Sequence, residues 1–143
     1  MELQVNLMDH SELDEALFFD AVPGAYPIYR EFKGAVLKVY PEIQIKVQKT
    51  QITFYNPRVF ACASLLPARR KAELPSPWLT VTLGLPYRLE SPRAAICTEP
   101  YPGRWTTHIV IGTPEEIDGE LLHWVDEAYR FAVTKKKSRL QTT

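Results

Sequence analysis

A change of hydrophobic period near residue 43 constrains this chain more than any other feature. Before it, apolar residues such as Phe32 and Val36 recur at helical spacing. Over residues 43–48, apolar and polar side chains then alternate strictly, in the order Ile-Gln-Ile-Lys-Val-Gln. A period of two is typical of a strand that is buried on one face and wetted on the other. The chain therefore contains a sheet with one polar face.

The remaining strand signals follow one another without an intervening helix. The alternation slips at Lys49 and Thr50, because Ile52 and Phe54 fall on the opposite parity, and this predicts a bulge or a tight turn. With that interrupted segment counted once, we predict about five strands, at residues 43–54, 59–66, 78–85, 93–99 and 105–111. Because no crossover helix joins them, we expect antiparallel pairing.

Three predicted helices frame these strands. The two N-terminal helices end at Pro23-Gly24 and at Pro41. The last helix is predicted to begin at Thr113-Pro114, where Glu116 completes a capping box. The predicted fold class is α+β: an antiparallel sheet of about five strands, with two N-terminal helices and one C-terminal helix packed on one face.

Length and composition indicate one globular domain. A chain of 143 residues can bury its own core, and 45 % apolar with 24 % charged residues is ordinary globular usage. We expect an N-terminal segment at 1–10, a single α+β domain at 11–136 and a flexible basic tail at 137–143. The first residues lack the pattern of a signal peptide, and no run is long and apolar enough for a membrane span, so the expected location is cytoplasmic.

The charge balance argues against a general nucleic-acid binder. Lys and Arg number 17, and so do Asp and Glu, whereas non-specific binders usually carry a basic excess. Two local basic clusters stand out, at residues 69–71 and 135–139. The second is expected to be the solvated end of the last helix, where cations suit the helix dipole.

The sequence carries no motif for catalysis, metal binding or cofactor binding. Its histidines, His10, His108 and His123, are far apart and none has a second ligand at metal-binding spacing, so no metal is expected. A Gly-x-Ser-x-Gly elbow, a phosphate loop and a dinucleotide-binding glycine motif are all missing, so no cofactor is expected. An enzyme is therefore the less favoured class of function.

A set of polar and aromatic residues occupies positions where a plain sheet does not require them. Arg and Lys supply charge-assisted hydrogen bonds to anions, while Tyr and Trp supply flat contact surfaces. The alternative is an ordinary wet face, with the arginines paired to nearby carboxylates. We expect the set to converge on the sheet face that the helices leave open. Its members are Lys46, Gln48, Lys49, Gln51, Arg88, Arg93, Glu99, Tyr101, Arg104, Trp105 and His108.

Several specific segments suggest a family. They are residues 47–52 (Val-Gln-Lys-Thr-Gln-Ile), 60–61, 83–86 (Leu-Gly-Leu-Pro), 91–93, 99–106 (Glu-Pro-Tyr-Pro-Gly-Arg-Trp-Thr) and the closing helix. Over residues 15–134 the chain resembles the bacterial domain-of-unknown-function family 5655, which is sometimes labelled a predicted transport protein. The resemblance implies no catalytic residue or cofactor, and nothing in the residues supports transport. Thr107 departs from the family, where a second histidine is expected beside His108.

Three functions follow, in order of preference. The first is a binding module whose polar and cationic site on the open sheet face takes an anionic small molecule or a protein partner. The second is a nucleic-acid-associated accessory domain in a restriction or defence context. It is suggested by the two basic clusters and by the resemblance, which implies that the family also occurs at the ends of larger proteins, some of them similar to modification-dependent restriction systems. The third is a small enzyme that uses Glu99 or His108 as acid or base. No membrane partner is expected, and the chain is expected to be a monomer or a homodimer.

Overall fold

Three helices and six strands make up the fold. The computed structural model describes the backbone of residues 10–142 and the side chains of residues 12–134. Its helices are α2 (His10–Phe18), α3 (Ala25–Val39) and α4 (Gly119–Thr142). Its strands are β1 (Gln44–Val47), β2 (Ile52–Tyr55), β3 (Val59–Ser64), β4 (Leu79–Leu85), β5 (Ala94–Tyr101) and β6 (Arg104–Ile111). Two short 3-10 turns, η1 (Lys71–Glu73) and η2 (Pro114–Glu116), complete the order, so the predicted α+β class is confirmed.

All six strands form one antiparallel sheet in the order β1-β2-β3-β4-β6-β5. There is one strand more than predicted, because the slip at Lys49 and Thr50 is a tight turn that separates β1 from β2. The turn is closed by the amide of Gln48, which donates to the carbonyl of Gln51 at 2.8 Å. The β5–β6 hairpin turns at Gly103, whose φ of 75° favours glycine.

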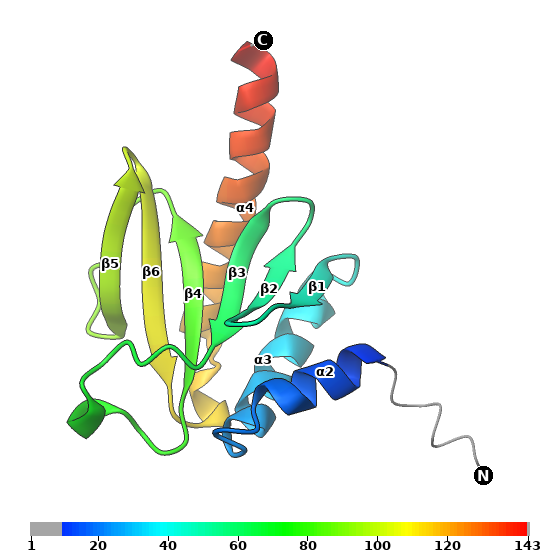
Figure 1. Ribbon diagram of the computed structural model, residues 1–143. Coiled ribbons are helices and arrows are strands. Elements are labelled where there is room, and N and C mark those ends of the chain that lie inside the picture. Colours follow the sequence, from blue (N-terminus) through cyan, green and yellow to red (C-terminus); the bar gives the residue numbers. More distant parts are fainter. Residues whose placement is uncertain (1–9, 143) are drawn as a thin grey trace.

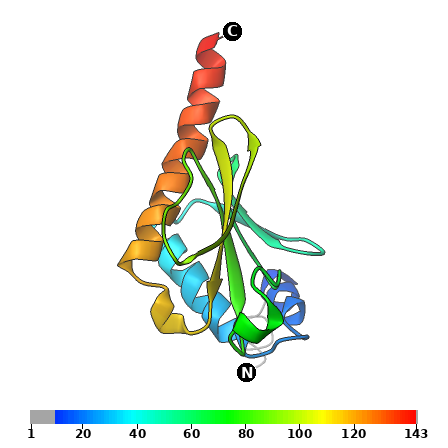
Figure 2. The same cartoon turned by 90° about the vertical axis from the view of Figure 1, so that its left-hand side faces the viewer.

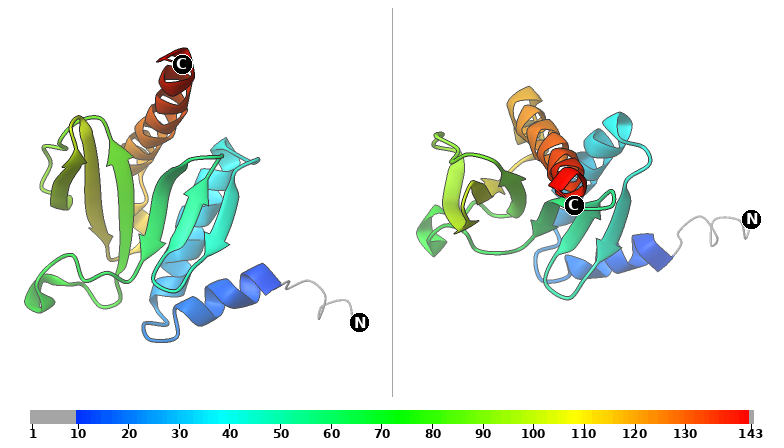
Figure 3. Two further views of the ribbon diagram at one scale, coloured as in Figure 1. Left: turned by 45° about the horizontal axis from the view of Figure 1, so that its top comes forward. Right: turned by 90° about the horizontal axis from the view of Figure 1, so that it is seen from above.

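Helices α3 and α4 cover one face of the sheet, and α4 runs past its upper end (Figures 1 and 2). The view from above places both helices on the same side (Figure 3). Helix α4 packs on β3 and β4, while α2 packs beside β1 near the lower edge. The helix-facing Val81 and Leu83 of β4 are fully buried, and Val81 lies between Ala63 of β3 and Ile109 of β6.

A buried carboxylate joins α2 to α3. The side chain of Glu15 is 3 % exposed, and it accepts hydrogen bonds from the Tyr29 hydroxyl and from Lys33 Nζ, the latter at 2.7 Å. Burial and the bond to Glu15 raise the pKa of Tyr29 above its ordinary range. This network fixes α2, whose outer face exposes Leu13 and Leu17.

The last helix begins later than predicted. The Thr113-Pro114 segment forms η2 instead, and no side-chain bond from Thr113 caps it. Glu116 turns back to accept the amide of Gly112 at 3.1 Å, and Asp118 caps α4 by accepting the amide of Leu121 at 3.0 Å. The capping-box signal therefore marked a short turn that precedes the helix.

The two ends of the chain differ from the sequence-based division. Helix α4 continues through residues 137–142, where a basic tail was predicted. The predicted segment 1–10 lies outside the described residues except for His10, which opens α2. Within the described part of the chain, no helix has the length and apolar character needed to cross a bilayer.

Candidate functional site

A single row of side chains crosses the face of the sheet that α3 and α4 leave uncovered, which faces the viewer in Figure 1. Strand pairing aligns one residue from each strand, and alternate residues of a strand share a face. We call these residues the open-face row. From β1 to β5 it consists of Lys46, Thr53, Cys62, Thr82, His108 and Ile96.

The centre of this face carries small side chains. Thr53 and Cys62 are buried in the row, and the next row toward the upper end contains Gly84 and Thr106. Burial raises the pKa of the Cys62 thiol, which keeps it in the unreactive protonated form. A wet sheet face more often carries long charged side chains. The open-face row is therefore a shallow polar surface whose middle lies close to the backbone.

His108 is the most distinctive residue of the row. Its Nδ1 lies 2.8 Å from the Thr82 hydroxyl, and burial lowers its pKa below the ordinary value, so the imidazole is neutral near pH 7. No bond to Nε2 is found among the described residues. If Thr82 donates to Nδ1, Nε2 carries a proton and is a donor; in the other tautomer, Nε2 is an acceptor. The ring therefore offers one uncommitted hydrogen-bonding group to a ligand.

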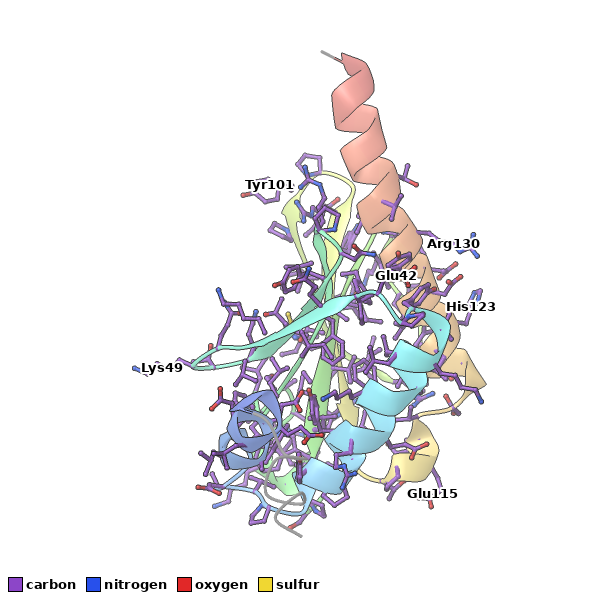
Figure 4. The ribbon with its side chains drawn as sticks, turned by 90° about the vertical axis from the view of Figure 1, so that its right-hand side faces the viewer. Glu42, Lys49, Tyr101, Glu115, His123 and Arg130 are labelled. Carbon is purple, nitrogen blue, oxygen red and sulfur yellow. The ribbon has the colours of Figure 1, made fainter. Side chains whose placement is uncertain are left out.

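The β1–β2 end of the row contains four of the predicted site residues. Gln48 accepts a hydrogen bond from the Thr53 hydroxyl, and Gln51 donates to the same hydroxyl at 3.0 Å. Lys46 and Lys49 are exposed, and Figure 4 shows Lys49 at the hairpin tip, pointing away from α3 and α4. Together with His108, these residues are the part of the predicted set that the open face brings together.

The lower end of the face is covered by the connection that follows β3. Thr80 donates to the carbonyl of Leu66 at 2.6 Å, and Trp78 Nε1 donates to the same carbonyl at 3.3 Å. The amide of Leu66 in turn donates to the Ser64 hydroxyl at 3.2 Å. Accessible polar groups are thus confined to the middle and upper part of the sheet.

Arg93 does not belong to the open face, contrary to the expected convergence. Its guanidinium bonds Asp118 and Glu120, each at 3.0 Å, and the carbonyl of Glu116 at 2.7 Å. It also lies 5.7 Å from the ring centre of Trp124. Arg93 therefore joins the start of β5 to the start of α4. This arrangement matches the alternative stated above, in which the arginines are paired with carboxylates of the protein.

Arg88 and Trp105 form a separate pair near the end of β4. Trp105 stands opposite Leu85, which is fully buried, so the indole lies on the helix side of the sheet. The Arg88 guanidinium is 5.8 Å from the ring centre of Trp105 and 3.8 Å from the carboxylate of Glu90. This pair therefore lies on the face of the sheet opposite to the open-face row.

The β5–β6 turn holds the last three predicted residues. Glu99 accepts the amide of Gly103 at 2.9 Å, which stabilises the turn. The guanidinium of Arg104 is 6.0 Å from the ring centre of Tyr101. Figure 4 shows Tyr101 at the upper end of the molecule, well away from Lys49. The predicted set therefore divides between the open face, the upper hairpin and two helix-side contacts.

The residues proposed for acid–base chemistry are not neighbours. Ile96 pairs with His108, and Glu99 lies three positions farther along β5, which corresponds to roughly 10 Å. A second histidine at position 107 could not act together with His108 on the open face. Thr107 pairs with the buried Leu83 and faces the helices. Cys62 and His108 are separated by Thr82 of the intervening strand. The geometry therefore weighs against these pairs.

The sequence-based set omitted residues that the structure makes prominent. Thr53 and Cys62 complete the open-face row, and their strand parity was the available signal. Arg58, directly before β3, has a buried Nε without a hydrogen-bond partner among the described residues. No sequence pattern indicated that this arginine would be unpaired.

A cavity of about 360 Å³ lies between α2 and β1, and Asp14, Glu15 and Lys46 are among its lining residues. Other large cavities lie away from the open face. Two of them, of about 330 and 560 Å³, lie between α3 and α4 and share Tyr40 and Asp126 in their walls. The Tyr40 hydroxyl donates to Asp126, and Arg130 Nε donates to the same carboxylate at 2.7 Å. Figure 4 shows Arg130 and His123 on this outer side of α4. Within the described residues, no group of three or more His, Cys, Asp or Glu side chains is placed to hold a metal ion.

Comparison with known proteins gives one match. The family model described as a domain of unknown function (DUF5655) matches residues 15–132, which include all six strands and most of α4. No curated protein and no solved structure matches the chain. The match covers the open-face row, the upper hairpin and the helices that support them. The chain therefore belongs to the DUF5655 family.

Proposed function

We propose that this domain binds a small polar molecule with an anionic group on its open-face row, and that it does no chemistry on the molecule. The observation that carries the proposal is the Thr82–His108 pair, half-buried at the centre of a face of small side chains. Its uncommitted imidazole nitrogen can bond a ligand that lies flat on the sheet.

The charge of the sheet favours an anion. Among the six strands, the acidic residue is Glu99, and its carboxylate is engaged in the β5–β6 turn. Residues 43–72 contain no Asp or Glu, but they include Lys46 and Lys49 beside the row. A negative group near this end meets Lys46 and Lys49. Two carboxylates of α2, Asp14 and Glu15, share a cavity with Lys46, and Glu15 is paired with Lys33.

The other two functions receive less support. An enzyme would need a reactive pair, and Glu99, Cys62 and His108 form none with one another. The basic clusters considered for nucleic acid lie on η1 and on the end of α4, at opposite ends of the molecule in Figure 1. In the first cluster, Arg69 and Arg70 already bond Pro92 and Glu73. No observation gathers these charges on one surface.

A thermal-shift screen of anionic small molecules, followed by titration calorimetry, tests the proposal. His108→Gln should weaken binding about tenfold or more, because one hydrogen bond in a half-buried site is lost. The matched control is His123→Gln, since the His123 side chain is 66 % exposed on the far side of α4. Its affinity should equal that of the wild type.

A second variant tests the charge contribution. Replacing Lys46 and Lys49 together by alanine should weaken binding and reduce its dependence on salt. Arg93 should not be included, because its loss would disturb the β5–α4 contact. Identical affinities in wild type, His108→Gln and the double variant would refute the open-face site.

A further inference from the structure

Two arginines meet at a small cavity at the upper end of the sheet. Arg58 precedes β3 and Arg104 opens β6, and these strands flank β4 on either side. Gly84 of β4 and Phe131 of α4 line the same cavity, whose volume is about 20 Å³. That volume accommodates about one water-sized group. In Figure 1, α4 passes the upper ends of β3, β4 and β6, which are the elements that supply or adjoin the lining residues.

No described residue neutralises the charge at this cavity. Neither Arg58 nor Arg104 forms an ion pair with any residue in the described part of the chain, and the buried Nε of Arg58 has no hydrogen-bond acceptor there. Arginine cannot lose its proton to relieve this situation. A buried donor that carries positive charge is costly to leave unpaired. An acceptor of negative charge from outside the chain would satisfy it.

The two guanidiniums are held in place by different neighbours. Arg104 lies 6.0 Å from the ring centre of Tyr101, a contact that orients the guanidinium without cancelling its charge. Arg58 lines the cavity together with Ala128 and Phe131 of α4. An ordered pair of guanidinium groups matches the paired oxygens of a carboxylate or phosphate.

We infer that Arg58 and Arg104 form an oxyanion-binding site that takes the phosphate or carboxylate group of a small molecule. One oxygen of the anion would lie in the cavity between the two arginine side chains, and the remaining oxygens would stay at the mouth beside Arg104. Arg58 Nε, which is covered in the unbound protein, would donate to this oxygen after a shift of its side chain. The small volume excludes a larger group from the interior. This site is separate from the open-face row, and it does not depend on the function proposed above.

Nuclear magnetic resonance of the arginine side chains gives a direct test. The ¹⁵N-labelled full chain is titrated with inorganic phosphate and, separately, with acetate, and chloride at matched ionic strength is the reference. The Nε–Hε signals of Arg58 and Arg104 should shift saturably with at least one of the two oxyanions. The oxyanion that binds more tightly, phosphate or acetate, identifies the preferred class of ligand. The absence of such shifts, or equal shifts with chloride, would overturn the inference.

Variants establish which groups bind the anion. Arg104→Gln, followed at the Arg58 signal, should weaken binding about tenfold or more, because a charge-assisted hydrogen bond is lost. Arg88→Gln is the matched control, since Arg88 is exposed and does not line the cavity, and the affinity of this variant should be unchanged. If Arg104→Gln bound the anion with wild-type affinity, the inference that Arg58 and Arg104 bind it together would be contradicted. The wild-type titration is informative by itself if a variant fails to fold.

Two further titrations distinguish the arginine pair from the open-face row and from a nucleic-acid contact. His108→Gln should leave the phosphate-induced shifts of Arg58 and Arg104 unchanged, so failure of the open-face proposal and failure of this one are distinguishable. A short single-stranded oligonucleotide is titrated in parallel. Saturation by the oligonucleotide without any response to phosphate or acetate would replace the small-molecule site with a nucleic-acid contact.

Discussion

Arg93 and Arg58 are residues of the same type in opposite situations. Arg93 is 23 % exposed and bonds two carboxylates and a backbone carbonyl, so its hydrogen-bonding groups are used within the protein. Arg58 has a buried Nε for which the described residues supply no acceptor. The first arginine holds two elements together, whereas the second keeps its binding capacity free.

The same contrast separates Glu15 from His108. Glu15 is satisfied by Tyr29 and Lys33, and it connects two helices. His108 bonds Thr82 through one nitrogen and presents the other. Buried polar groups that serve the fold are expected to be fully paired. Under the two proposals above, His108 and Arg58 are candidates for ligand contacts, whereas the Thr107 hydroxyl, which is also buried without a partner among the described residues, faces the helices. Substitutions should distinguish the paired groups from these candidates.

The largest effect is expected at Glu15. Glu15→Ala should lower the free energy of unfolding by about 3 kcal/mol, because Tyr29 and Lys33 lose their shared acceptor in a buried setting. Urea denaturation measures the change. The exposed neighbour provides the control, and Asp14→Ala should change stability by less than about 0.5 kcal/mol. Equal losses of stability in Glu15→Ala and Asp14→Ala would mean that the buried hydrogen bonds of Glu15 do not stabilise the fold.

Arg93 should give a smaller loss. Arg93→Gln is expected to lower the free energy of unfolding by about 2 kcal/mol, since several charge-assisted hydrogen bonds are lost at a partly exposed site. Arg88→Gln removes one positive charge from an exposed side chain, so it measures the effect of losing charge alone and should lower stability less than Arg93→Gln.

The effect of Arg93→Gln should also depend on pH. The amide of Leu121 and, to a lesser extent, Arg93 lower the pKa of Asp118 in the folded state. The contribution of the Asp118 carboxylate to stability is therefore fully present at pH values above its unfolded pKa of about 4. It is lost as the pH falls through the lower pKa of the folded state. The difference between wild type and Arg93→Gln should shrink in that acidic range, and a constant difference would contradict the Asp118 contact.

Arg58 should give the smallest effect. Without ligand, Arg58→Gln is expected to change the free energy of unfolding by less than about 0.5 kcal/mol, or to raise it, because an unpaired charge is removed and no bond is broken. Urea denaturation in a buffer free of phosphate and carboxylate measures it. A loss as large as that of Arg93→Gln would mean that Arg58 has a structural role, and the contrast between the two arginines would fail.

Local patterns predicted much of the fold. Alternation over residues 43–48 identified the one-sided sheet, and the parity slip at Lys49 placed the turn between β1 and β2. The helix start was displaced, because Thr113 and Glu116 are compatible with a 3-10 turn as well as with an α-helix. Asp118 caps α4 instead, since its carboxylate reaches the Leu121 amide.

The candidate site was predicted less completely. Lys46, Gln48, Lys49, Gln51 and His108 share the open face as expected. Arg93 was expected there too, but its partners come from Asp118 and Glu120, about 25 residues away in the sequence, and no local pattern reveals such a pairing.

The sequence by itself determined the antiparallel α+β architecture and the polar character of one sheet face, because both depend on the period of neighbouring residues. The tertiary structure decided which polar groups remain free. Whether an arginine is paired depends on carboxylates brought from distant segments, as Arg93 and Arg58 show. Hydrogen-bond satisfaction is a property of the packed chain, and for this reason the sequence alone could not distinguish the paired Arg93 from the unpaired Arg58.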